Sequence, residues 1–520
     1  MSETTEQCRD LPGLAESYWI ASSETTAFPP LAGDGRVDVT VLGGGIAGIT
    51  VAYLLKSSGY TVALVESDRI IRGTSGYTTA KLTSLHRLIY RYLTDAFGSR
   101  KARQYADSNQ GAIEKVAELV RELSIDCGFV RKPAYTYAES ASSRPDVEQE
   151  ADSAKALGLP ARFVEEIPLP AESFGAVRVD DQAQFHPRKY LLGLAARIPG
   201  EGSYIFENTR ALGLTEINNY VKVTTGGGAI ESDAVILATH FPLHDRPGGY
   251  YSRLSPSRSY AIGARIGEPF PEGMFINAAG TVHSWRSHSD GERELVIVTG
   301  EEHPTGTISD TRARYRMLES YARTVYDVRW IDYHWSAQDY FTPDRVPYIG
   351  PMTEGHERIF VATGFNKWGM SAGTAAALIL ADLVRGRSNP WAEVFSPSRF
   401  ETGKPPGATL DAILLAAGGE IETPSARYYQ EISSIPANGG AVITIDGKNI
   451  AIYKDAAGNV HTLDPTCMHM GCRVRWNNAE RSWDCPCHGS RYDPTGHVIE
   501  GPTVKDLVKI KIKRSGDRPE

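Results

Sequence analysis

The sequence predicts an α/β domain at its N-terminal end and a small all-β domain that holds a metal at its C-terminal end. An apolar strand pattern at Val37–Leu42 runs into a glycine-rich turn, a helical pattern at Ile46–Ser58 and a second strand at Thr61–Glu66, which together form a βαβ unit. At the other end, four of the six cysteines lie between positions 467 and 487, and such clustering indicates a metal centre. A chain of 520 residues is also expected to form two or three domains.

The glycine-rich turn of the βαβ unit has the GxGxxG pattern of a dinucleotide site. The first glycine allows a tight turn, the second lets the backbone approach a pyrophosphate, and the third lets helix and strand pack closely. The helix start offers N–H groups to phosphates, and an acidic residue at the end of the second strand can bind ribose hydroxyls. The predicted contacts are Gly43, Gly45, Ile46, Ala47, Gly48 and Glu66.

The cysteine cluster consists of two short motifs, CMHMGC at Cys467–Cys472 and CPCHGSRY at Cys485–Tyr492. Each motif offers a cysteine with a histidine, Cys467 with His469 and Cys485 with His488. Thiolates suit ferric iron, and imidazoles on one iron of a two-iron cluster raise its reduction potential. The alternative is a Cys₂His₂ zinc site, which uses the same ligand types.

The choice between NAD and FAD follows from the presence of both sites in one chain. A nicotinamide passes hydride, an iron-sulfur cluster accepts single electrons, and flavin handles both, so FAD is the predicted cofactor. A flavoprotein driven by a pyridine nucleotide should show a second dinucleotide fingerprint. None is found, because the glycines at Gly226–Gly228 lie between short strands and open no helix.

The C-terminal motifs resemble those of the Rieske [2Fe-2S] family. In that family two cysteines bind the buried iron and two histidines the outer iron, a second cysteine pair forms a disulfide between the cluster loops, and two hydroxyls hydrogen-bond the cluster sulfurs. Cys467 and Cys485 match the ligands of the buried iron, and His469 and His488 match those of the outer iron. Cys472 and Cys487 match the disulfide pair, and Ser490 and Tyr492 match the two hydroxyls. A zinc site would leave the last four of these without a purpose.

The first 400 or so residues resemble the glycine oxidase and D-amino acid oxidase family. Besides the fingerprint, the resemblance rests on GTSGYTTAK at Gly73–Lys81, DRVPYIGP at Asp344–Pro351 and ATGFNKWGMSAG at Ala362–Gly373. It implies that the first and last of these segments lie beside the flavin. The implied neighbours are Thr74, Ser75, Thr79, Ala80, Lys81, Gly364, Gly369, Met370 and Ser371.

The second resemblance also implies a chemistry, the oxidation of a C–N bond next to a carboxylate with hydride transfer to the flavin. An arginine usually holds the substrate, and the candidate cations here are Arg258, Arg286 and Lys367. No catalytic base is assigned, because orientation of the C–H bond over the flavin supplies much of the effect.

The two resemblances together predict a Rossmann-like α/β FAD-binding domain with an inserted α+β substrate domain, followed by an all-β Rieske domain. The apolar strand at Ala234–Ala238 is expected to rejoin the first sheet, and Tyr340–Pro351 is expected to be a loop. The oxidoreductase part is placed at 36–395, with FAD-binding parts at about 36–85, 175–250 and 340–395, substrate parts at about 86–174 and 251–339, a linker at 396–424 and the Rieske domain at 425–516.

The predicted function is dehydrogenation of an amine or amino acid, with single electrons passing from FAD to the cluster and on to an external protein. One alternative is a reductase or oxygen-activating enzyme fed through the cluster, and another is an electron carrier or redox sensor without a substrate. A net charge of −8 favours no nucleic acid partner, and the apolar stretches are too short to span a membrane. The polar, acidic N-terminal segment lacks a secretory signal, so a cytoplasmic location is expected.

Overall fold

The computed structural model describes residues 11–245, 247–289, 291, 294–399, 431–445 and 447–510. The chain forms two compact units. The first unit comprises Met1–Tyr250, Ser259–Glu302 and Tyr315–Gly403, and the second comprises Tyr251–Arg258, His303–Arg314 and Lys404–Glu520. Cys8, the linker from 400 to 424 and the turn residue Asp446 lie outside the described residues.

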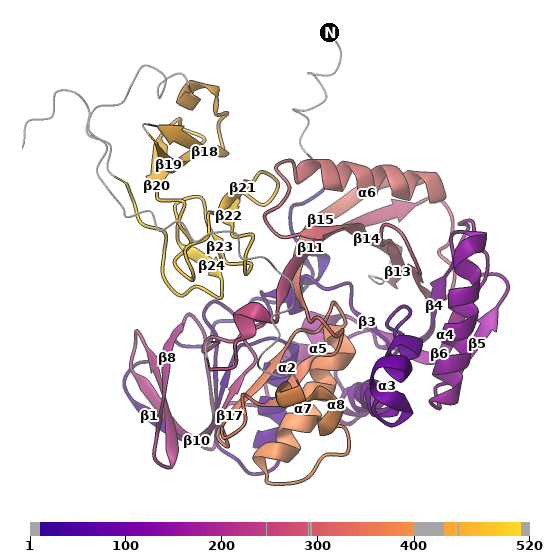
Figure 1. Ribbon diagram of the computed structural model, residues 1–520, viewed down its shortest axis with the longest axis horizontal. Coiled ribbons are helices and arrows are strands. Elements are labelled where there is room, and N and C mark those ends of the chain that lie inside the picture. Colours follow the sequence, from indigo (N-terminus) through magenta and orange to yellow (C-terminus); the bar gives the residue numbers. More distant parts are fainter. Residues whose placement is uncertain are drawn as a thin grey trace, which may run out of the picture. The chain divides into compact units, whose positions relative to one another are not determined.

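The first unit contains an eight-stranded sheet, in which the predicted βαβ unit is confirmed (Figure 1). Its main path is β16 (Tyr348–Pro351), β17 (Ile359–Thr363), β10 (Ala229–Leu237), β1 (Gly35–Leu42), β2 (Val62–Val65) and β7 (Tyr204–Phe206), and β8 (Ala211–Ile217) with β9 (Tyr220–Thr225) joins beside β10. Strands β17, β10, β1, β2 and β7 are parallel. Strand β10 pairs directly with β1, so the expectation that Ala234–Ala238 rejoins this sheet is confirmed.

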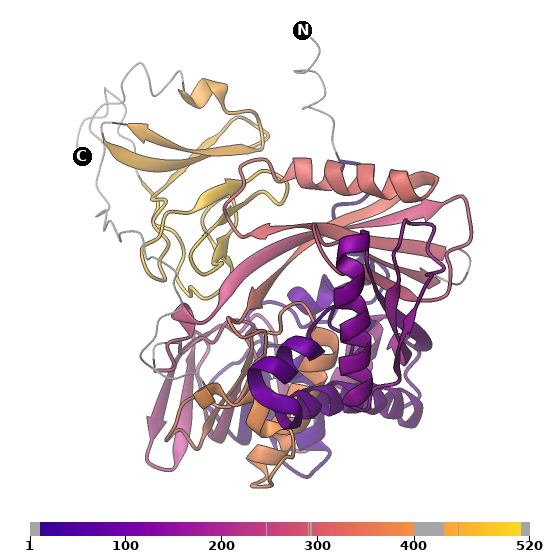
Figure 2. The same ribbon diagram turned by 45° about the vertical axis from the view of Figure 1, so that its right-hand side comes forward.

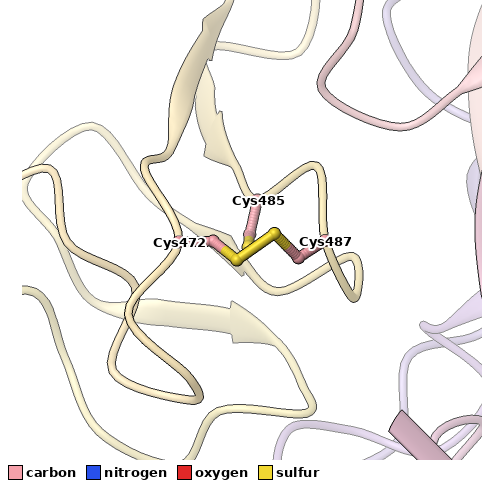
Figure 3. A group of neighbouring side chains, drawn as sticks. All are labelled: Cys472, Cys485 and Cys487. Carbon is pink, nitrogen blue, oxygen red and sulfur yellow. A yellow bond between two sulfur atoms is a disulfide. The ribbon is translucent and has the colours of Figure 1, made fainter. Parts of the chain in front are cut away.

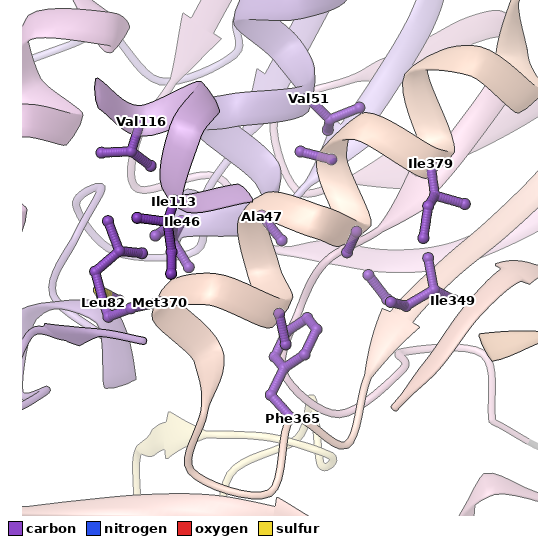
Figure 4. Close-up of a cluster of buried hydrophobic side chains, with 14 of the residues drawn as sticks. Ile46, Ala47, Val51, Leu82, Ile113, Val116, Ile349, Phe365, Met370 and Ile379 are labelled. Atoms are coloured by element: carbon purple, nitrogen blue, oxygen red, sulfur yellow. The ribbon is translucent and has the colours of Figure 1, made fainter. Parts of the chain in front are cut away.

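Helices pack against the parallel sheet around an apolar core (Figure 4). Helix α2 (Ile46–Lys56) packs on α7 (Gly369–Val384), and the contact is close because Gly373 has no side chain. A Cβ atom on Gly373 would lie 2.8 Å from the Ile46 Cγ2 atom. Further helices are α1 (Tyr18–Ala21), α3 (Tyr90–Glu122, with a break at Gly98), α4 (Arg144–Ala156), α5 (Pro187–Ala195) and α8 (Ala392–Phe395), and short 3₁₀ turns lie at Thr74–Gly76, Ala141–Ser143, Tyr250–Ser252 and Pro397–Arg399.

A second, nine-stranded sheet carries the α+β part of the fold (Figure 2). Its main path is β15 (Val328–Phe341), β11 (Ser255–Ile266), β14 (Glu294–Pro304), β13 (Ser284–Ser289), β12 (Met274–Asn277), β4 (Val130–Tyr137), β6 (Ala176–Gln184) and β3 (Lys81–Leu82), with β5 (Ala161–Val164) on β6. Helix α6 (Arg312–Val325) packs on this sheet, where the Tyr315 ring contacts Tyr260 at a centroid distance of 4.7 Å.

One detail of the sheets differs from expectation. Strand β16 lies within the predicted loop Tyr340–Pro351, because its residues pair antiparallel with β17 despite the flanking prolines. A strand's burial pattern does not reveal which sheet it joins, since pairing partners are distant in sequence.

The second unit contains the small β-domain. Strands β18 (Gly439–Ile445), β19 (Lys448–Lys454) and β20 (Val460–Leu463) form an antiparallel meander. Strands β21 (Arg475–Asn477), β22 (Ser482–Asp484), β23 (Arg491–Tyr492) and β24 (Val498–Glu500) form a second antiparallel sheet. Among the described residues, no helix is both long and apolar enough to cross a bilayer.

Candidate functional site

The glycine turn between β1 and α2 is built so that only glycine fits. Gly43 has a φ of +104°, and a Cβ atom there would lie 2.4 Å from the carbonyl oxygen of Ala238. A Cβ on Gly48 would lie 1.9 Å from the carbonyl oxygen of Gly43. These contacts are with backbone atoms, which cannot move aside, so strand and helix can approach only without side chains here.

The polar groups around this turn suit a dinucleotide. Glu66, at the end of β2, accepts a hydrogen bond from the Gly44 N–H at 2.8 Å, and Ser75 Oγ accepts one from the Ile46 N–H at 3.0 Å. Helix α2 has no side-chain cap because its N-cap is Gly45. A helix N-terminus whose N-cap residue has no side chain is the usual pyrophosphate site, so these residues fit an FAD.

The loop that precedes β3 is held by side chains from distant parts of the first unit. Three side chains donate to consecutive backbone carbonyls: Trp335 Nε1 to Tyr77 at 2.9 Å, Trp19 Nε1 to Thr78 at 2.6 Å, and Arg286 to Ala80 at 2.7 Å and Thr79 at 3.2 Å. Ala80 itself has a φ of +56°, a conformation that costs free energy and needs such support. This clamp fixes the loop that is predicted to contact the flavin.

Trp19 is a residue of this site that the sequence did not indicate. It lies in helix α1, is fully buried, and has the Arg286 guanidinium 5.3 Å from its ring centroid. A buried aromatic pair, Tyr18-Trp19, in an otherwise polar N-terminal segment was the one available signal.

Lys81 extends from the end of the clamped loop into a partly buried position. Its Nζ donates to Ser284 Oγ at 2.8 Å and Thr79 Oγ1 at 3.2 Å. Burial, together with the nearby charge of Arg286, lowers the pKa of Lys81 to about 7. A lysine amine that is half neutral at physiological pH can donate or accept a proton.

The segment before α7 forms a second constrained loop. Gly364, Asn366 and Lys367 all have positive φ angles, and Asp339 accepts a hydrogen bond from the Lys367 N–H at 2.8 Å. Further on, Ser371 Oγ lies 3.0 Å from the His86 Nε2 atom. The remaining residues predicted here, Gly369 and Met370, begin helix α7.

His86 is a buried histidine that contacts this loop. Its ring stacks on Trp368 at a centroid distance of 4.5 Å, and its Nδ1 lies 2.6 Å from the Tyr105 hydroxyl. Burial lowers the pKa of His86 to about 3, so the ring stays neutral. His86 and Trp368 therefore support the loop as a packed pair.

The three candidate cations for a substrate carboxylate lie in different surroundings. Arg286 donates to the loop carbonyls described above. Arg258 belongs to the second unit, where its Nε lies 3.9 Å from Asp484 Oδ2. Lys367 Nζ lies 2.8 Å from Glu302 Oε2, beside the start of α7.

In the second unit, two tight loops bring together the four predicted iron ligands. Each loop closes on itself, since the Gly471 N–H donates to the Cys467 carbonyl and the Gly489 N–H to the Cys485 carbonyl. Cys467 and Cys485 are buried thiols. The ring atoms His469 Nδ1 and His488 Nδ1 face each other at 3.2 Å, with the ring planes at 90°.

Hydrogen bonds around Cys467 favour its thiolate form, whereas the same pairing raises the pKa of Cys485. A hydrogen bond from the Cys485 thiol is the largest cause that lowers the pKa of Cys467 to about 6, against the opposing effect of burial. The Tyr492 hydroxyl donates to Cys467 Sγ at 3.3 Å. Ser490 is fully buried beside them, and its Oγ accepts a hydrogen bond from the Thr503 N–H at 3.2 Å. Two thiolates and two imidazoles in this arrangement fit a Rieske cluster.

A disulfide links the two cluster loops. Cys472 and Cys487 are bonded, and the Cys485 sulfur lies within 4.8 Å of both of their sulfurs (Figure 3). Of these three sulfurs only that of Cys485 is a thiol, so the group does not form a three-cysteine metal site.

Comparison with known proteins agrees with both halves of this geometry. The family model for "FAD dependent oxidoreductase" matches residues 38–383. The chain belongs to this oxidoreductase family. The "Rieske [2Fe-2S] domain" model matches residues 428–511, so this FAD-dependent oxidoreductase carries a C-terminal Rieske domain, and its cofactors are FAD and a [2Fe-2S] cluster.

Two similar sequences and one similar structure agree with these two matches. YhfW of Bacillus subtilis, described as a Rieske 2Fe-2S iron-sulfur protein, is 37% identical over 503 residues, covering 96% of this chain and 98% of YhfW. The cytochrome b6-f complex iron-sulfur subunit 1 of a Nostoc species is 40% identical over 73 residues, 14% of this chain and 41% of the subunit. The structure of glycine oxidase from Geobacillus kaustophilus has a TM-score of 0.60 at 19% identity, covering 71% of this chain and 100% of the oxidase.

The pKa of Lys81 gives a prediction for stability. The unfolded chain keeps the lysine proton up to a pH near 10.5, whereas the folded protein releases it near pH 7. Between these values the unfolded chain binds more protons, so the free energy of unfolding should rise with pH by up to about 1.4 kcal/mol per pH unit. The variant Lys81→Met should lose this rise, as measured by denaturant unfolding between pH 6 and pH 9.

The exposed residue Lys155 provides the control for this measurement. Lys155→Met should keep the pH dependence of the wild-type protein. Equal slopes for wild type and Lys81→Met would show that the buried amine does not titrate in this range.

Proposed function

We propose that this FAD-dependent oxidoreductase dehydrogenates the C–N bond of an amine or amino acid and passes the electrons singly through its Rieske cluster to an external acceptor protein. The observation that supports this proposal is that one chain holds both a dinucleotide site and a cluster site. The first suits a two-electron cofactor and the second a one-electron cofactor. Glycine oxidase, to which the first unit is similar in fold, is named for an amino acid substrate.

The residues proposed to hold the FAD are those of the two constrained loops and the glycine turn. The turn from Gly43 to Gly48 and the start of α2 would bind the pyrophosphate, and Glu66 would bind the ribose. Thr74, Ser75, Thr79, Ala80 and Lys81 on one loop, and Gly364, Gly369, Met370 and Ser371 on the other, would lie beside the ring system. Bound FAD supplies hydride acceptance and single-electron release.

The proposed reaction is a two-electron oxidation of the substrate. The substrate carbon loses a hydride and its nitrogen loses a proton, which leaves an imine that water can hydrolyse. Lys81 Nζ, with a pKa of about 7, is a suitable group to hold the proton. The two electrons leave one at a time, so each turnover reduces two equivalents of a one-electron acceptor.

Among the candidate cations, Lys367 is the one we assign to the substrate carboxylate. Arg286 is engaged with the carbonyls of Thr79 and Ala80, and Arg258 belongs to the second unit beside Asp484. Lys367 lies in the loop before α7, and its partner Glu302 is a side chain that a substrate carboxylate can replace.

Replacing Lys367 tests this assignment. Lys367→Met should raise KM about tenfold or more and leave kcat little changed, since a charged hydrogen bond to bound substrate would be lost. Steady-state kinetics with the amine substrate measure both constants. Lys367→Arg, which keeps the charge, should restore most of the affinity; a KM unchanged in Lys367→Met would rule the assignment out.

The reaction itself is tested by adding candidate amines and amino acids to the purified protein without oxygen. The expected result is bleaching of the flavin absorbance followed by the EPR signal of a reduced cluster. A flavin that stays oxidised with every amine, but is reduced when dithionite first reduces the cluster, would contradict the proposed direction of electron flow.

A further inference from the structure

The second unit contains more than the Rieske domain. Two segments that are distant in sequence, Tyr251–Arg258 and His303–Arg314, belong to the same compact unit. They are continuous along the chain with strands β11 and β14 and helix α6. The Rieske domain is therefore packed against segments that lead directly into the oxidoreductase part of the chain.

Buried polar contacts hold one of these segments to the Rieske domain. The Thr311 hydroxyl lies 2.6 Å from Asn477 Oδ1, and its N–H donates to Asn478 Oδ1 at 3.0 Å. Asn478 Nδ2 in turn donates to Asp310 Oδ1 at 3.0 Å. Such mutually satisfied groups specify one arrangement, because a displaced partner would leave buried polar atoms unpaired.

A buried charge network holds the other segment next to a cluster loop. Asp484, which precedes the cluster ligand Cys485, lies 3.9 Å from Arg258 Nε and 3.2 Å from Arg491 Nε. The side chains of Arg258 and Asp484 are almost completely buried, and that of Arg491 is 13% exposed. A buried carboxylate between two guanidinium groups requires both partners, since removal of one leaves an uncompensated charge.

At the cluster itself, both segments cover the loop that carries His488. A Cβ atom on Gly306 would lie 3.0 Å from the Pro486 nitrogen and 3.2 Å from the Asp484 carbonyl oxygen, so two backbones are in direct contact there. The Tyr251 ring meets the His488 ring edge-on, with centroids 6.4 Å apart and planes at 90°. His488 is consequently only 6% exposed.

The second histidine of the cluster site has a different environment. His469 is only partly buried, and its neighbour Met468 is 38% exposed. The two histidines of one site thus differ in what surrounds them. One is covered by the chain's own segments, and the other lies at the edge that a separate molecule can reach.

We propose that Tyr251 and Gly306 position the covered face of the cluster for electron transfer within the chain, so that each electron from the flavin enters through His488. This inference rests on the proposed function for the source of the electrons. Tyr251 follows Tyr250, whose hydroxyl donates to the Met352 carbonyl at 2.9 Å in the first unit. The chain is therefore held by a hydrogen bond in the first unit one residue before Tyr251. Each transfer oxidises the flavin by one electron and reduces one iron, and a one-electron acceptor protein then reoxidises that iron at the His469 edge.

The test uses the full chain with both cofactors and the variant Tyr251→Leu, with Tyr251→Phe as the matched control that keeps the ring. A laser flash with 5-deazaflavin photoreduces the protein, and the absorbance of flavin and cluster follows the equilibration between them without any amine. Tyr251→Leu should slow this intramolecular step about tenfold or more, since small displacements of a positioned group have effects of this size. Tyr251→Phe should keep the wild-type rate.

Two further readouts separate a positioning role from general damage. Tyr251→Leu should change the EPR line shape of the reduced cluster, because the ring that contacts His488 is lost. Ile499→Thr, at a site that is 48% exposed, should change neither the rate nor the spectrum. An intramolecular rate and EPR spectrum in Tyr251→Leu that match wild type would overturn the proposal, as would a wild-type protein in which the flash produces no transfer.

The flash experiment also distinguishes failure of this inference from failure of the proposed function. If no amine reduces the flavin but flash-induced transfer still depends on Tyr251, the route through His488 stands and only the substrate assignment falls.

Discussion

Replacing Cys485 by serine is expected to remove the iron-sulfur cluster and leave the flavin in place. Cys485 is a buried thiol next to Cys467, and a serine hydroxyl cannot supply the thiolate that iron requires. Iron content and the cluster EPR signal should disappear. Reduction of a one-electron acceptor protein should fall by about 100-fold or more, since loss of even a supporting group at a metal site costs tenfold to 100-fold.

The flavin half of the same variant provides the internal comparison. Amine-dependent bleaching of the flavin should persist in Cys485→Ser, because the dinucleotide site lies in the other unit. Cys127→Ser is the matched control, since Cys127 is also a buried thiol but lies in the first unit. A variant Cys485→Ser with the wild-type cluster signal would refute the assignment of this ligand.

The substitution Gly48→Ala is expected to abolish FAD binding. The added Cβ would lie 1.9 Å from the Gly43 carbonyl oxygen, so either the turn or helix α2 must move. Both elements carry the predicted pyrophosphate contacts. We expect affinity for FAD to fall at least about 100-fold, equivalent to about 2.7 kcal/mol, and the purified protein to contain cluster without flavin. FAD released by denaturation and quantified by absorbance measures the loss.

A second glycine at the start of β1 offers the control for this variant. A Cβ on Gly35 would meet nothing within 4 Å, so Gly35→Ala should bind FAD like the wild-type protein. Stoichiometric FAD in Gly48→Ala would show that the turn tolerates a side chain and that the steric argument is wrong.

The regular elements around the glycine-rich turn were well predicted from the sequence. The helix predicted at Ile46–Ser58 matches α2, which begins at the same residue, and the strand predicted at Val37–Leu42 matches β1, which begins two residues earlier. These elements have clear periodicity and end at glycine or proline, so local sequence is sufficient to define them.

The sheet that a strand joins and the partners of a side chain were harder to predict from the sequence. Strand β16 is flanked by prolines and reads as a loop, yet pairing with β17 makes it a strand. Arg286 was a candidate for binding substrate, and its position shows a guanidinium on the Thr79 and Ala80 carbonyls. A lone arginine in a sequence gives no information about its partners, because those partners can lie more than 200 residues away.

The sequence by itself determined the two cofactor types and most of the residues proposed to bind them. The glycines of the fingerprint lie close together in sequence, as do the cysteines and histidines within each cluster motif. The local backbone of a single turn is therefore enough to place them. Only the tertiary structure decided how those turns are supported and connected. Trp19, Trp335 and Arg286 reach one loop across sequence separations of 59, 258 and 206 residues, and Tyr251 reaches His488 in the same way. Contacts of this kind depend on how sheets and helices pack, and that packing is set by the whole hydrophobic core rather than by any local motif.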